Sequence, residues 1–347
     1  MKEALSFDDV LLVPKYSDIE SRKYIDISNK LDGNINLMLP VISSPMDTVT
    51  ELAMAKAMDD YGGLGIVHRY NTIEKQSSII KQFHMKRPPS NIGAAVGVTG
   101  DYLERALAAV NAGANIICVD VAHGHHHSVE KALKVLKEKF NDPKFLKRIG
   151  SVHLMAGNVA NVEAFNDLAD WGADSIRVGI GGGSICSTRI QTGHGIPTFQ
   201  SIRDCSYTSR DAKIIADGGI KTNGDIVKAF AAGADFVMLG SMLAGTSETP
   251  GSIFNSKNKK YKVYRGMASK DAQDAWRGKS SAPEGVSITI PFKGSVREIL
   301  DTMIGNIQSG FSYSGVKCFE ELWLKAEFIK QTSAGLVESS THIMRGK

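Results

Sequence analysis

The sequence predicts an α/β fold, a TIM (β/α)8 barrel, on the strength of three observations. Eight short apolar runs recur along the chain, helical patterns lie between them, and similar glycine-alanine junctions join helix to strand. The runs are apolar throughout, which is typical of parallel strands that are covered on both faces. The predicted strands are Leu39–Ile42, Leu64–His68, Ile92–Val98, Ile116–Val121, Val152–Met155, Ser175–Ile180, Lys213–Ala216 and Phe236–Leu239.

Between these strands, apolar residues recur at i, i+3 and i+4, the spacing that places them on one face of a helix. Several of these segments end at a glycine, which commonly terminates a helix. The junctions Ala112-Gly113-Ala114, Gly172-Ala173-Asp174 and Gly233-Ala234-Asp235 repeat this pattern. The predicted helices are Glu51–Tyr61, Thr72–Lys86, Tyr102–Ala112, Ser128–Phe140, Asn161–Trp171 and Asn223–Ala232.

The length of 347 residues allows two domains at roughly 150 residues each, but α/β barrels commonly run to about 250 residues or more as one unit. Eight β/α units favour a single barrel domain over residues 1–347. After the last strand we expect a lid or flap at about Tyr261–Lys293 and two helices, Val296–Ile307 and Phe319–Thr332. The polar last dozen residues are expected to form a loose tail.

Composition and charge exclude several classes of protein. Hydrophobic residues make up 42% of the chain and charged residues 22%, which is typical of soluble globular proteins. The 41 basic and 37 acidic residues are scattered, so an extended nucleic-acid surface is not expected; the one dense run, Lys257–Lys262, is predicted to be a solvated turn. No apolar run approaches about 18 residues and no signal-like segment starts the chain, so we expect a cytoplasmic protein without a membrane segment.

The four cysteines lie far apart with no C-x-x-C spacing, as expected of a protein in a reducing compartment. Cys118 lies inside a predicted strand and is expected to be a buried, inert thiol. Cys186 lies among glycines and hydroxyl residues beside Arg189, a setting that could stabilise a thiolate, although a buried inert thiol is the alternative. Cys205 and Cys318 have no obvious partner.

The 34 glycines, about a tenth of the chain against a usual ~7%, fall in clusters at predicted strand ends. The active site of a barrel lies at the C-terminal ends of its strands, and the loops after the seventh and eighth strands commonly bind phosphate through backbone N–H groups. Asp217-Gly218-Gly219 and Gly240-Ser241 stand at these two positions. We therefore expect a phosphorylated ligand, with tight turns as the alternative explanation of the glycines.

Two other patterns are weaker. Gly179–Ser184 lacks the third glycine and the following acidic residue of a dinucleotide-binding fingerprint, so a nicotinamide cofactor would bind without a Rossmann fold. The histidines of His123–His127 could suggest a metal site, but adjacent histidines on one loop rarely converge on one ion. A solvent-exposed turn or a ligand contact is the favoured interpretation.

The segment Ile176–Thr188, read as IRVGIGGGSICST, resembles the signature of the IMP dehydrogenase and GMP reductase family. In this signature Gly182 stands where the family usually has proline, which could loosen the loop that binds a monovalent cation in relatives. Further matching motifs cover nearly the whole chain: Phe7–Pro14, Ser44–Val49, Gly157-Asn158-Val159, Asp217-Gly218-Gly219, Met238–Ser241, Tyr264–Met267 and Pro291–Gly294.

The resemblance implies that Cys186 attacks C2 of a purine nucleotide, with Thr188 and Glu284 as the proton-transfer pair. It implies substrate contacts at Ser184, Asp217, Gly218, Gly219, Gly240, Ser241, Tyr264, Gly266, Met267 and Ala268. The implied cofactor contacts, some of them from a neighbouring subunit, are Ser21, Arg22, Asp120, Val121, Ala122, Ile180, Gly181, Ser314 and Gly315. The backbone carbonyls of Gly181, Gly183 and Cys186 are the implied ligands of a monovalent cation such as K+.

The family contains two opposed reactions. IMP dehydrogenases oxidise IMP with NAD and then hydrolyse the covalent intermediate, using water activated by an Arg-Tyr pair on a mobile flap, whereas GMP reductases expel ammonia from GMP and reduce the intermediate with NADPH. Here the segment between Met267 and Glu284 contains no tyrosine, and the link Lys86–Asn91 is too short for the regulatory domain that many dehydrogenases carry. By contrast, Ser43–Asp47 and Gly62–His68 resemble the dehydrogenase versions of these loops.

The resemblance therefore favours an NADPH-dependent GMP reductase acting through a covalent Cys186 intermediate, with NAD-dependent IMP dehydrogenase as the alternative. A third hypothesis, from another class, is a nucleotide-binding barrel without catalytic activity. The expected partner is a purine mononucleotide, with no nucleic acid and no membrane, and the family resemblance implies a homotetramer.

Overall fold

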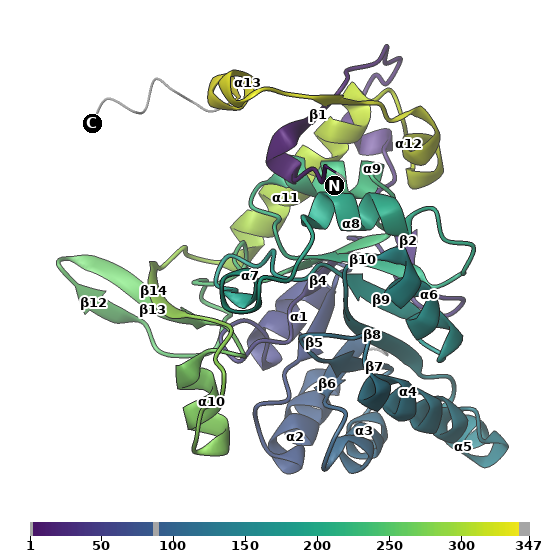
Figure 1. Cartoon of the computed structure of the whole chain (residues 1–347), viewed down its shortest axis with the longest axis vertical. Coiled ribbons are helices and arrows are strands. Elements are labelled where there is room, and N and C mark those ends of the chain that lie inside the picture. Colours follow the sequence, from purple (N-terminus) through teal and green to yellow (C-terminus); the bar gives the residue numbers. More distant parts are fainter. Residues whose placement is uncertain (1–2, 86–89, 340–347) are drawn as a thin grey trace.

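The computed structural model describes residues 3–85 and 90–339, and it confirms the predicted TIM barrel. Eight parallel strands pair in chain order, and the last pairs with the first to close the barrel (Figure 1). Six strands begin at the predicted residue and end within two residues of the predicted end, whereas the first begins two residues later and the fifth extends four residues further. They are β4 (Val41–Ser43), β5 (Leu64–Val67), β6 (Ile92–Val96), β7 (Ile116–Asp120), β8 (His153–Val159), β9 (Ser175–Val178), β10 (Lys213–Asp217) and β11 (Phe236–Leu239).

Helices surround the barrel, and side chains outside them define where several begin. Thr72, Asn161 and Thr222 each accept a hydrogen bond from a first-turn backbone N–H, the N-cap interaction that satisfies an otherwise free donor. The helices between strands are α1 (Leu52–Asp60), α2 (Ile73–His84), α3 (Tyr102–Asn111), α4 (His127–Phe140), α6 (Val162–Asp170), α8 (Thr198–Cys205) and α9 (Asn223–Ala231), with the short additional helices α5 (Pro143–Ile149) and α7 (Thr188–Thr192).

The eighth helix of the barrel is α11 (Val296–Tyr313), which packs against α9 and α1. The sequence predicts this segment only as a helix that follows the barrel and ends at Ile307. Its buried residues recur at helical spacing up to Phe311, so one face of the helix stays packed beyond the predicted end at Ile307.

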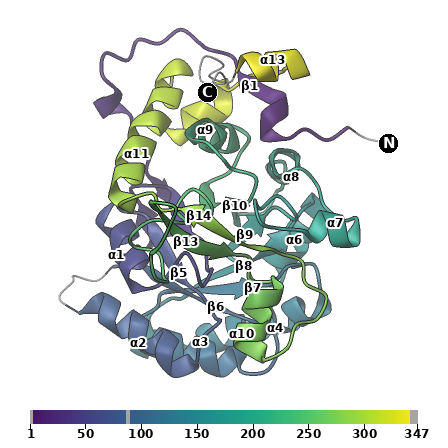
Figure 2. The ribbon, with the colours of Figure 1, turned by 90° about the vertical axis from the view of Figure 1, so that its left-hand side faces the viewer.

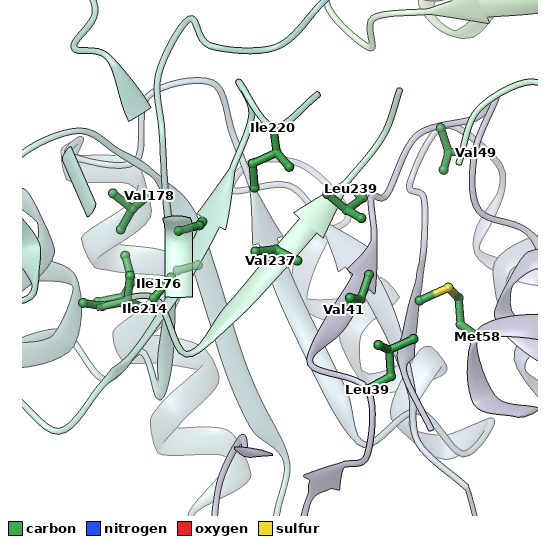
Figure 3. Close-up of a cluster of buried hydrophobic side chains, with 14 of the residues drawn as sticks. Leu39, Val41, Val49, Met58, Ile176, Val178, Ile214, Ile220, Val237 and Leu239 are labelled. Carbon is green, nitrogen blue, oxygen red and sulfur yellow. The ribbon is translucent and has the colours of Figure 1, made fainter. Parts of the chain in front are cut away.

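Two hydrophobic layers form the core, because alternate residues of each strand face opposite sides. Val41 and Val237 are register partners on β4 and β11 and face the helices (Figure 3). Their neighbours Ile42 and Met238 belong to a separate cluster inside the barrel. This interior cluster also contains Leu31, Ile35 and Leu37, which come from the hairpin of β2 (Asn29–Lys30) and β3 (Asn36–Leu37). The hairpin was not predicted, and it extends the barrel interior.

A flap is inserted between β11 and α11. It consists of a three-stranded antiparallel sheet, β12 (Phe254–Ser256), β13 (Lys259–Arg265) and β14 (Ser287–Pro291), and of α10 (Lys270–Arg277). The flap projects to one side of the barrel in Figure 1, and in Figure 2 β13, β14 and α10 lie in front of it. The flap therefore begins before the predicted Tyr261.

The prediction that Lys257–Lys262 is a solvated turn is wrong at its last residue. The turn itself lies at Lys257 and Asn258, which have positive φ angles. Lys262, in contrast, is 2% exposed, and its Nζ donates hydrogen bonds to the carbonyls of Thr246 and Thr249. Burial lowers the pKa of this ammonium group.

The two ends of the described chain pair with each other. β1 (Val10–Leu12) and β15 (Phe328–Lys330) form an antiparallel two-stranded sheet, so the predicted helix Phe319–Thr332 is wrong after α12 (Phe319–Lys325). The backbone turns extended at Ala326, which frees the next residues to pair with β1. The predicted tail contains part of α13 (Ser333–Glu338), and its residues 340–347 lie outside the described part, as do residues 86–89 of the predicted link. Two single-turn helices, η1 (Phe7–Asp9) and η2 (Arg22–Tyr24), complete the elements.

Over residues 3–85 and 90–339, no helix combines the length and the apolar character that crossing a membrane requires.

Candidate active site

A cavity of about 480 Å3 opens at the carboxyl ends of the barrel strands, where the sequence predicts the site. The three predicted catalytic residues, Cys186, Thr188 and Glu284, line it. So do all ten predicted substrate contacts: Ser184, Asp217, Gly218, Gly219, Gly240, Ser241, Tyr264, Gly266, Met267 and Ala268.

Cys186, Thr188 and Glu284 form one hydrogen-bonded chain. The Cys186 Sγ donates to Thr188 Oγ1 at 3.2 Å, and that hydroxyl donates to Glu284 Oε2 at 2.7 Å. All three side chains are partly buried. The donors run from sulfur to carboxylate, so a proton that leaves the thiol has a direct route to Glu284.

Backbone pairing between the flap and the cysteine loop places Glu284 there. Ser187 N donates to the carbonyl of Glu284 at 2.9 Å, and Val286 N donates to the carbonyl of Ile185 at 3.0 Å. The segment of the flap between α10 and β14 thus lies alongside the loop, with an antiparallel bridge between Cys186 and Gly285.

At the other end of the cavity, backbone from three loops meets. Gly218 and Gly219 have φ angles of +91° and +79°, which side chains rarely adopt, and a Cβ on Gly218 would lie 3.0 Å from Gly183 N. A Cβ on Gly240 would lie 3.0 Å from Tyr264 Oη. Burial raises the pKa of Tyr264 to about 12, so its hydroxyl stays a hydrogen-bond donor at neutral pH.

Arg177, which is 7% exposed, holds two carboxylates of the cavity together. Its Nη1 lies 2.5 Å from Asp120 Oδ1, and its Nη2 lies 2.9 Å from Asp217 Oδ2. Burial alone would raise the pKa of Asp120, but the charges of Arg177 and Arg69 outweigh it and lower the pKa. Asp217 Oδ2 also accepts from Asn158, so the hydrogen bonds to this carboxylate converge on one oxygen.

Sequence reasoning missed several residues of the cavity wall. Arg69 and Tyr70 follow β5 and line the cavity, and the Arg69 guanidinium carbon lies 5.4 Å from the centre of the Tyr70 ring. The Tyr70 ring stacks on Trp276 of α10, with ring centres 6.0 Å apart. Their position after the second predicted strand is the signal that could have identified Arg69 and Tyr70. Asn158, Lys221 and Gln273 also line the cavity.

The predicted cofactor residues fall into two groups. Asp120, Val121, Ala122, Ile180 and Gly181 line the cavity. Ser21, Arg22, Ser314 and Gly315 do not line it; they lie at η2 and at the C-terminal end of α11, two elements that pack against each other. The three residues predicted to bind K+, Gly181, Gly183 and Cys186, all border the cavity. The Gly183 carbonyl accepts a hydrogen bond from Cys186 N.

A second cavity of about 200 Å3 adjoins the first and shares Arg69 and Val121 with it. Trp276, the loop after β6 and Arg105 of α3 complete its wall.

Of the other cysteines, Cys118 and Cys205 are fully buried, and burial raises both thiol pKa values to about 12. The prediction that Cys118 is buried is confirmed by its place in the interior cluster. Cys318 is partly buried at the start of α12.

The histidine loop forms a turn before α4. His126 caps this helix by accepting a hydrogen bond from Ser128 N, and His125 pairs with Asp167 at 2.7 Å. Within the part of the chain that the structure describes, no three metal-ligating side chains come together. The loop therefore fits the favoured interpretation of a turn.

Comparison with known proteins identifies the family. A model of the IMP dehydrogenase / GMP reductase domain matches residues 4–342. The chain belongs to this family of oxidoreductases. It is 33% identical to the inosine-5'-monophosphate dehydrogenase of Nitrosopumilus maritimus, over 98% of both chains, and 31% identical to the GMP reductase of Leishmania major, over 99% of this chain and 97% of that one.

Among solved structures, a cysteine-to-alanine variant of the GMP reductase of Trypanosoma brucei in complex with guanosine 5'-monophosphate is similar. It has a TM-score of 0.92 and 30% identity, over 99% of this chain and 98% of that one.

The alignments with the N. maritimus and L. major proteins extend over 477 and 485 residues, so both proteins have residues that this 347-residue chain lacks. One of them is named a dehydrogenase and the other a reductase. The absence of an inserted segment therefore does not separate the two activities.

Proposed function

We propose that this oxidoreductase is a GMP reductase, which converts GMP and NADPH into IMP, ammonia and NADP. The observation that carries the proposal is the hydrogen-bonded chain of Cys186, Thr188 and Glu284, combined with a flap that has no tyrosine between Met267 and Glu284. A carboxylate linked to the nucleophile can pass the thiol proton to the amine that leaves as ammonia, whereas hydrolysis would need a group that activates water.

In the first step, the Cys186 sulfur bonds to C2 of guanine and the bond from C2 to the exocyclic amine breaks. The thiol proton passes through Thr188 to Glu284, and from there to the leaving amine, which departs as ammonia. The proton lost by sulfur is thus the proton gained by nitrogen. General acid–base assistance of this kind contributes about 10²–10⁴ in rate.

In the second step C2 is reduced, and NADPH, when bound, would supply the hydride. The bond from carbon to sulfur then breaks, IMP is released, and the Cys186 thiolate takes up a proton. The glycine backbones of the cavity and the neutral Tyr264 hydroxyl would bind the nucleotide phosphate. Asp217, whose hydrogen bonds to protein converge on Oδ2, would accept from the ribose hydroxyls through Oδ1.

The two adjoining cavities fit an extended cofactor. Asp120, Val121 and Ala122 would hold the nicotinamide end beside Cys186, and the smaller cavity behind Arg69 and Trp276 would take the next part of the molecule. Ser21, Arg22, Ser314 and Gly315, which do not line either cavity, would contribute from a neighbouring subunit of a homotetramer. The carbonyls of Gly181, Gly183 and Cys186 would bind K+ and order the cysteine loop.

IMP dehydrogenase is the second candidate, and one observation favours it. Although the flap lacks a tyrosine, Arg69 and Tyr70 bring a guanidinium group and a phenol to the same cavity from another loop. If this pair could activate water, the covalent intermediate would be hydrolysed to XMP.

Two assays that follow absorbance of the reduced cofactor distinguish the candidates. We expect the purified protein to oxidise NADPH with GMP and to release ammonia, and to show little reduction of NAD with IMP. Turnover only with IMP and NAD would replace the reductase by the dehydrogenase. Nucleotide binding without turnover in either assay would indicate the inactive nucleotide-binding barrel.

A further inference from the structure

An ion pair joins the flap to the barrel beside the cavity. Arg265 is the last residue of β13, and Asp47 lies in the loop after β4. Arg265 Nε donates to Asp47 Oδ2 at 3.0 Å, and Arg265 Nη2 donates to the same oxygen. Neither residue lines the cavity, but their direct neighbours Met46 and Gly266 do. The pair therefore joins two walls of the site at a point just outside it.

Further hydrogen bonds hold the same part of the flap. Thr48 Oγ1, on a residue that is 8% exposed, accepts from Arg265 N at 3.2 Å. Asp47 N donates to Met267 Sδ at 3.3 Å. Arg265 Nη1 donates to the carbonyl of Asp271 in α10 at 3.3 Å. The loop after β4 thus holds the flap on both sides of position 266, through backbone and side-chain atoms.

The stretch of the flap that is held in this way pairs directly with the stretch that carries Glu284. Glu284 N donates to the carbonyl of Ala268 at 3.0 Å, and Gly266 N donates to the carbonyl of Val286 at 3.1 Å. A continuous series of hydrogen bonds and short backbone links therefore leads from Asp47 to the backbone of Glu284.

Stability alone does not explain the pair of Asp47 and Arg265. Both guanidinium hydrogen bonds fall on Asp47 Oδ2, whereas Asp47 Oδ1 is buried and has no hydrogen-bond partner in the described part of the chain. An unsatisfied buried acceptor destabilises a fold, and buried ion pairs often contribute little net stability. Charge-assisted hydrogen bonds are short and directional, so the pair is better suited to fixing a position than to stabilising the fold.

We propose that Asp47 and Arg265 are positioning residues for Glu284. They hold flap residues 266–268 against the barrel, and this stretch in turn holds the Glu284 carboxylate at the distance from Thr188 that the proton route requires. Both residues act through the flap backbone, because neither lines the cavity. The proposal rests on the proposed role of Glu284 in proton transfer, and it applies to reductase and dehydrogenase alike.

The first test compares Asp47→Ala, which removes the acceptor, with Asp47→Asn, which keeps one oxygen in its place. We expect Asp47→Ala to lower kcat about ten- to hundredfold, because a displacement of a catalytic group by about 1 Å has an effect of this size. The dissociation constant of GMP, measured by calorimetry without cofactor, should change far less. Asp47→Asn should retain part of the lost rate.

Thr48→Val provides a second variant at a different atom of the same contact. It removes the acceptor of Arg265 N at nearly constant shape, so it should also lower kcat more than GMP affinity. Unchanged kcat in both Asp47→Ala and Thr48→Val would overturn the proposal. A loss of GMP affinity as large as the loss of kcat would overturn it as well, since that result would show only a general disturbance of the site.

Asp170→Ala is the matched control. Asp170 also accepts two hydrogen bonds from a guanidinium group, that of Arg210, at 2.9 and 2.8 Å. Neither Asp170 nor Arg210 lines the two adjoining cavities. The control should therefore leave kcat and the dissociation constant of GMP unchanged.

The second test is a double-mutant cycle with Glu284→Gln. If Asp47 acts through Glu284, Asp47→Ala should cause little further loss of the single-turnover rate when Glu284→Gln is already present. The same fold-loss in both backgrounds would contradict the positioning role. If the protein turns over IMP with NAD instead of GMP with NADPH, the same cycle is measured in that assay.

The rate at which iodoacetamide alkylates Cys186 provides a readout that does not require turnover. Because Thr188 links the sulfur to Glu284, Asp47→Ala should change this rate in the same direction as Glu284→Gln, and the two changes should not add. This pattern without turnover in either assay would refute the proposed function but not the positioning role. A Cys186 alkylation rate that Asp47→Ala leaves unchanged would overturn the positioning role.

Discussion

Thr188 Oγ1 donates a 2.7 Å hydrogen bond to Glu284 Oε2 across 96 positions of sequence. Thr188 begins the short helix after the cysteine loop, and Glu284 lies in the segment of the flap between α10 and β14. The carboxylate therefore reaches the thiol only when the flap lies against the loop. The proton route therefore depends on the backbone pairing that holds this segment of the flap against the cysteine loop.

Removing either link of this chain should reduce turnover more than binding. We expect Glu284→Gln and Thr188→Val each to lower kcat by about 10²–10⁴ in the NADPH-dependent assay, with little change in the dissociation constant of GMP. Stopped-flow measurement of NADPH oxidation under single-turnover conditions provides the rate. A Glu284→Gln protein with unchanged kcat would exclude the proposed proton route.

Cys186 should be the thiol that reacts with iodoacetamide at the active site. Cys118 and Cys205 are buried with pKa values of about 12, so they should remain unlabelled in the folded protein. Mass spectrometry of digests should show alkylation of Cys186 that GMP prevents. Cys186→Ala should lose all turnover, whereas Cys318→Ala should keep it.

Arg177→Met should destabilise the fold strongly. The substitution leaves Asp120 and Asp217 as partly buried carboxylates without their shared cation, and removing one partner of such a buried network costs about 3–5 kcal/mol in free energy of unfolding. Arg210→Met is the control, because its ion pair with Asp170 is exposed and contributes about 1 kcal/mol at most. Urea unfolding followed by circular dichroism measures both, and equal effects would contradict the structural role assigned to Arg177.

Trp276→Ala should weaken cofactor binding selectively. Trp276 stacks on Tyr70 and lines the smaller cavity, which does not include the glycine loops. We expect the KM for NADPH to rise about five- to tenfold through the loss of roughly 1 kcal/mol of aromatic contact, while the KM for GMP changes little. Trp323→Ala, at a tryptophan of similar exposure outside both cavities, should leave both constants unchanged.

Glu51 should make the stability of the protein depend on acidic pH. Its hydrogen bond to His68, opposed by burial and aided by Lys75, lowers its pKa to about 2 from an ordinary value of 4.5. A lowered carboxyl pKa stabilises the fold above the unfolded value, and this contribution is lost as pH falls from about 4.5 to about 2.

Glu51→Gln should therefore lower the free energy of unfolding at pH 7 by on the order of 1–3 kcal/mol. The difference from the unaltered protein should shrink steadily as the pH is lowered toward 2. A difference that stays constant between pH 7 and pH 3 would contradict this assignment.

The barrel and the location of the site could be predicted because their signals are local. Each strand is a short apolar run, and parallel strands place all of their carboxyl ends on one side, so residues such as Asp217 and Gly240 had to meet there. The same local reasoning does not identify partners. It did not show that α11 covers the barrel, that Phe328–Lys330 pairs with β1, or that Lys262 is buried.

The sequence by itself determined the eight-unit barrel, the family and the residues of the cavity rim, because periodicity and motif spacing are properties of neighbouring positions. Only the tertiary structure decided that Glu284 meets Thr188, that Tyr70 stacks on Trp276, and that Arg265 of the flap pairs with Asp47 of the barrel. These contacts join segments that are far apart along the chain. They depend on packing that is precise to about a few tenths of an ångström, and no local pattern of residue types encodes that precision.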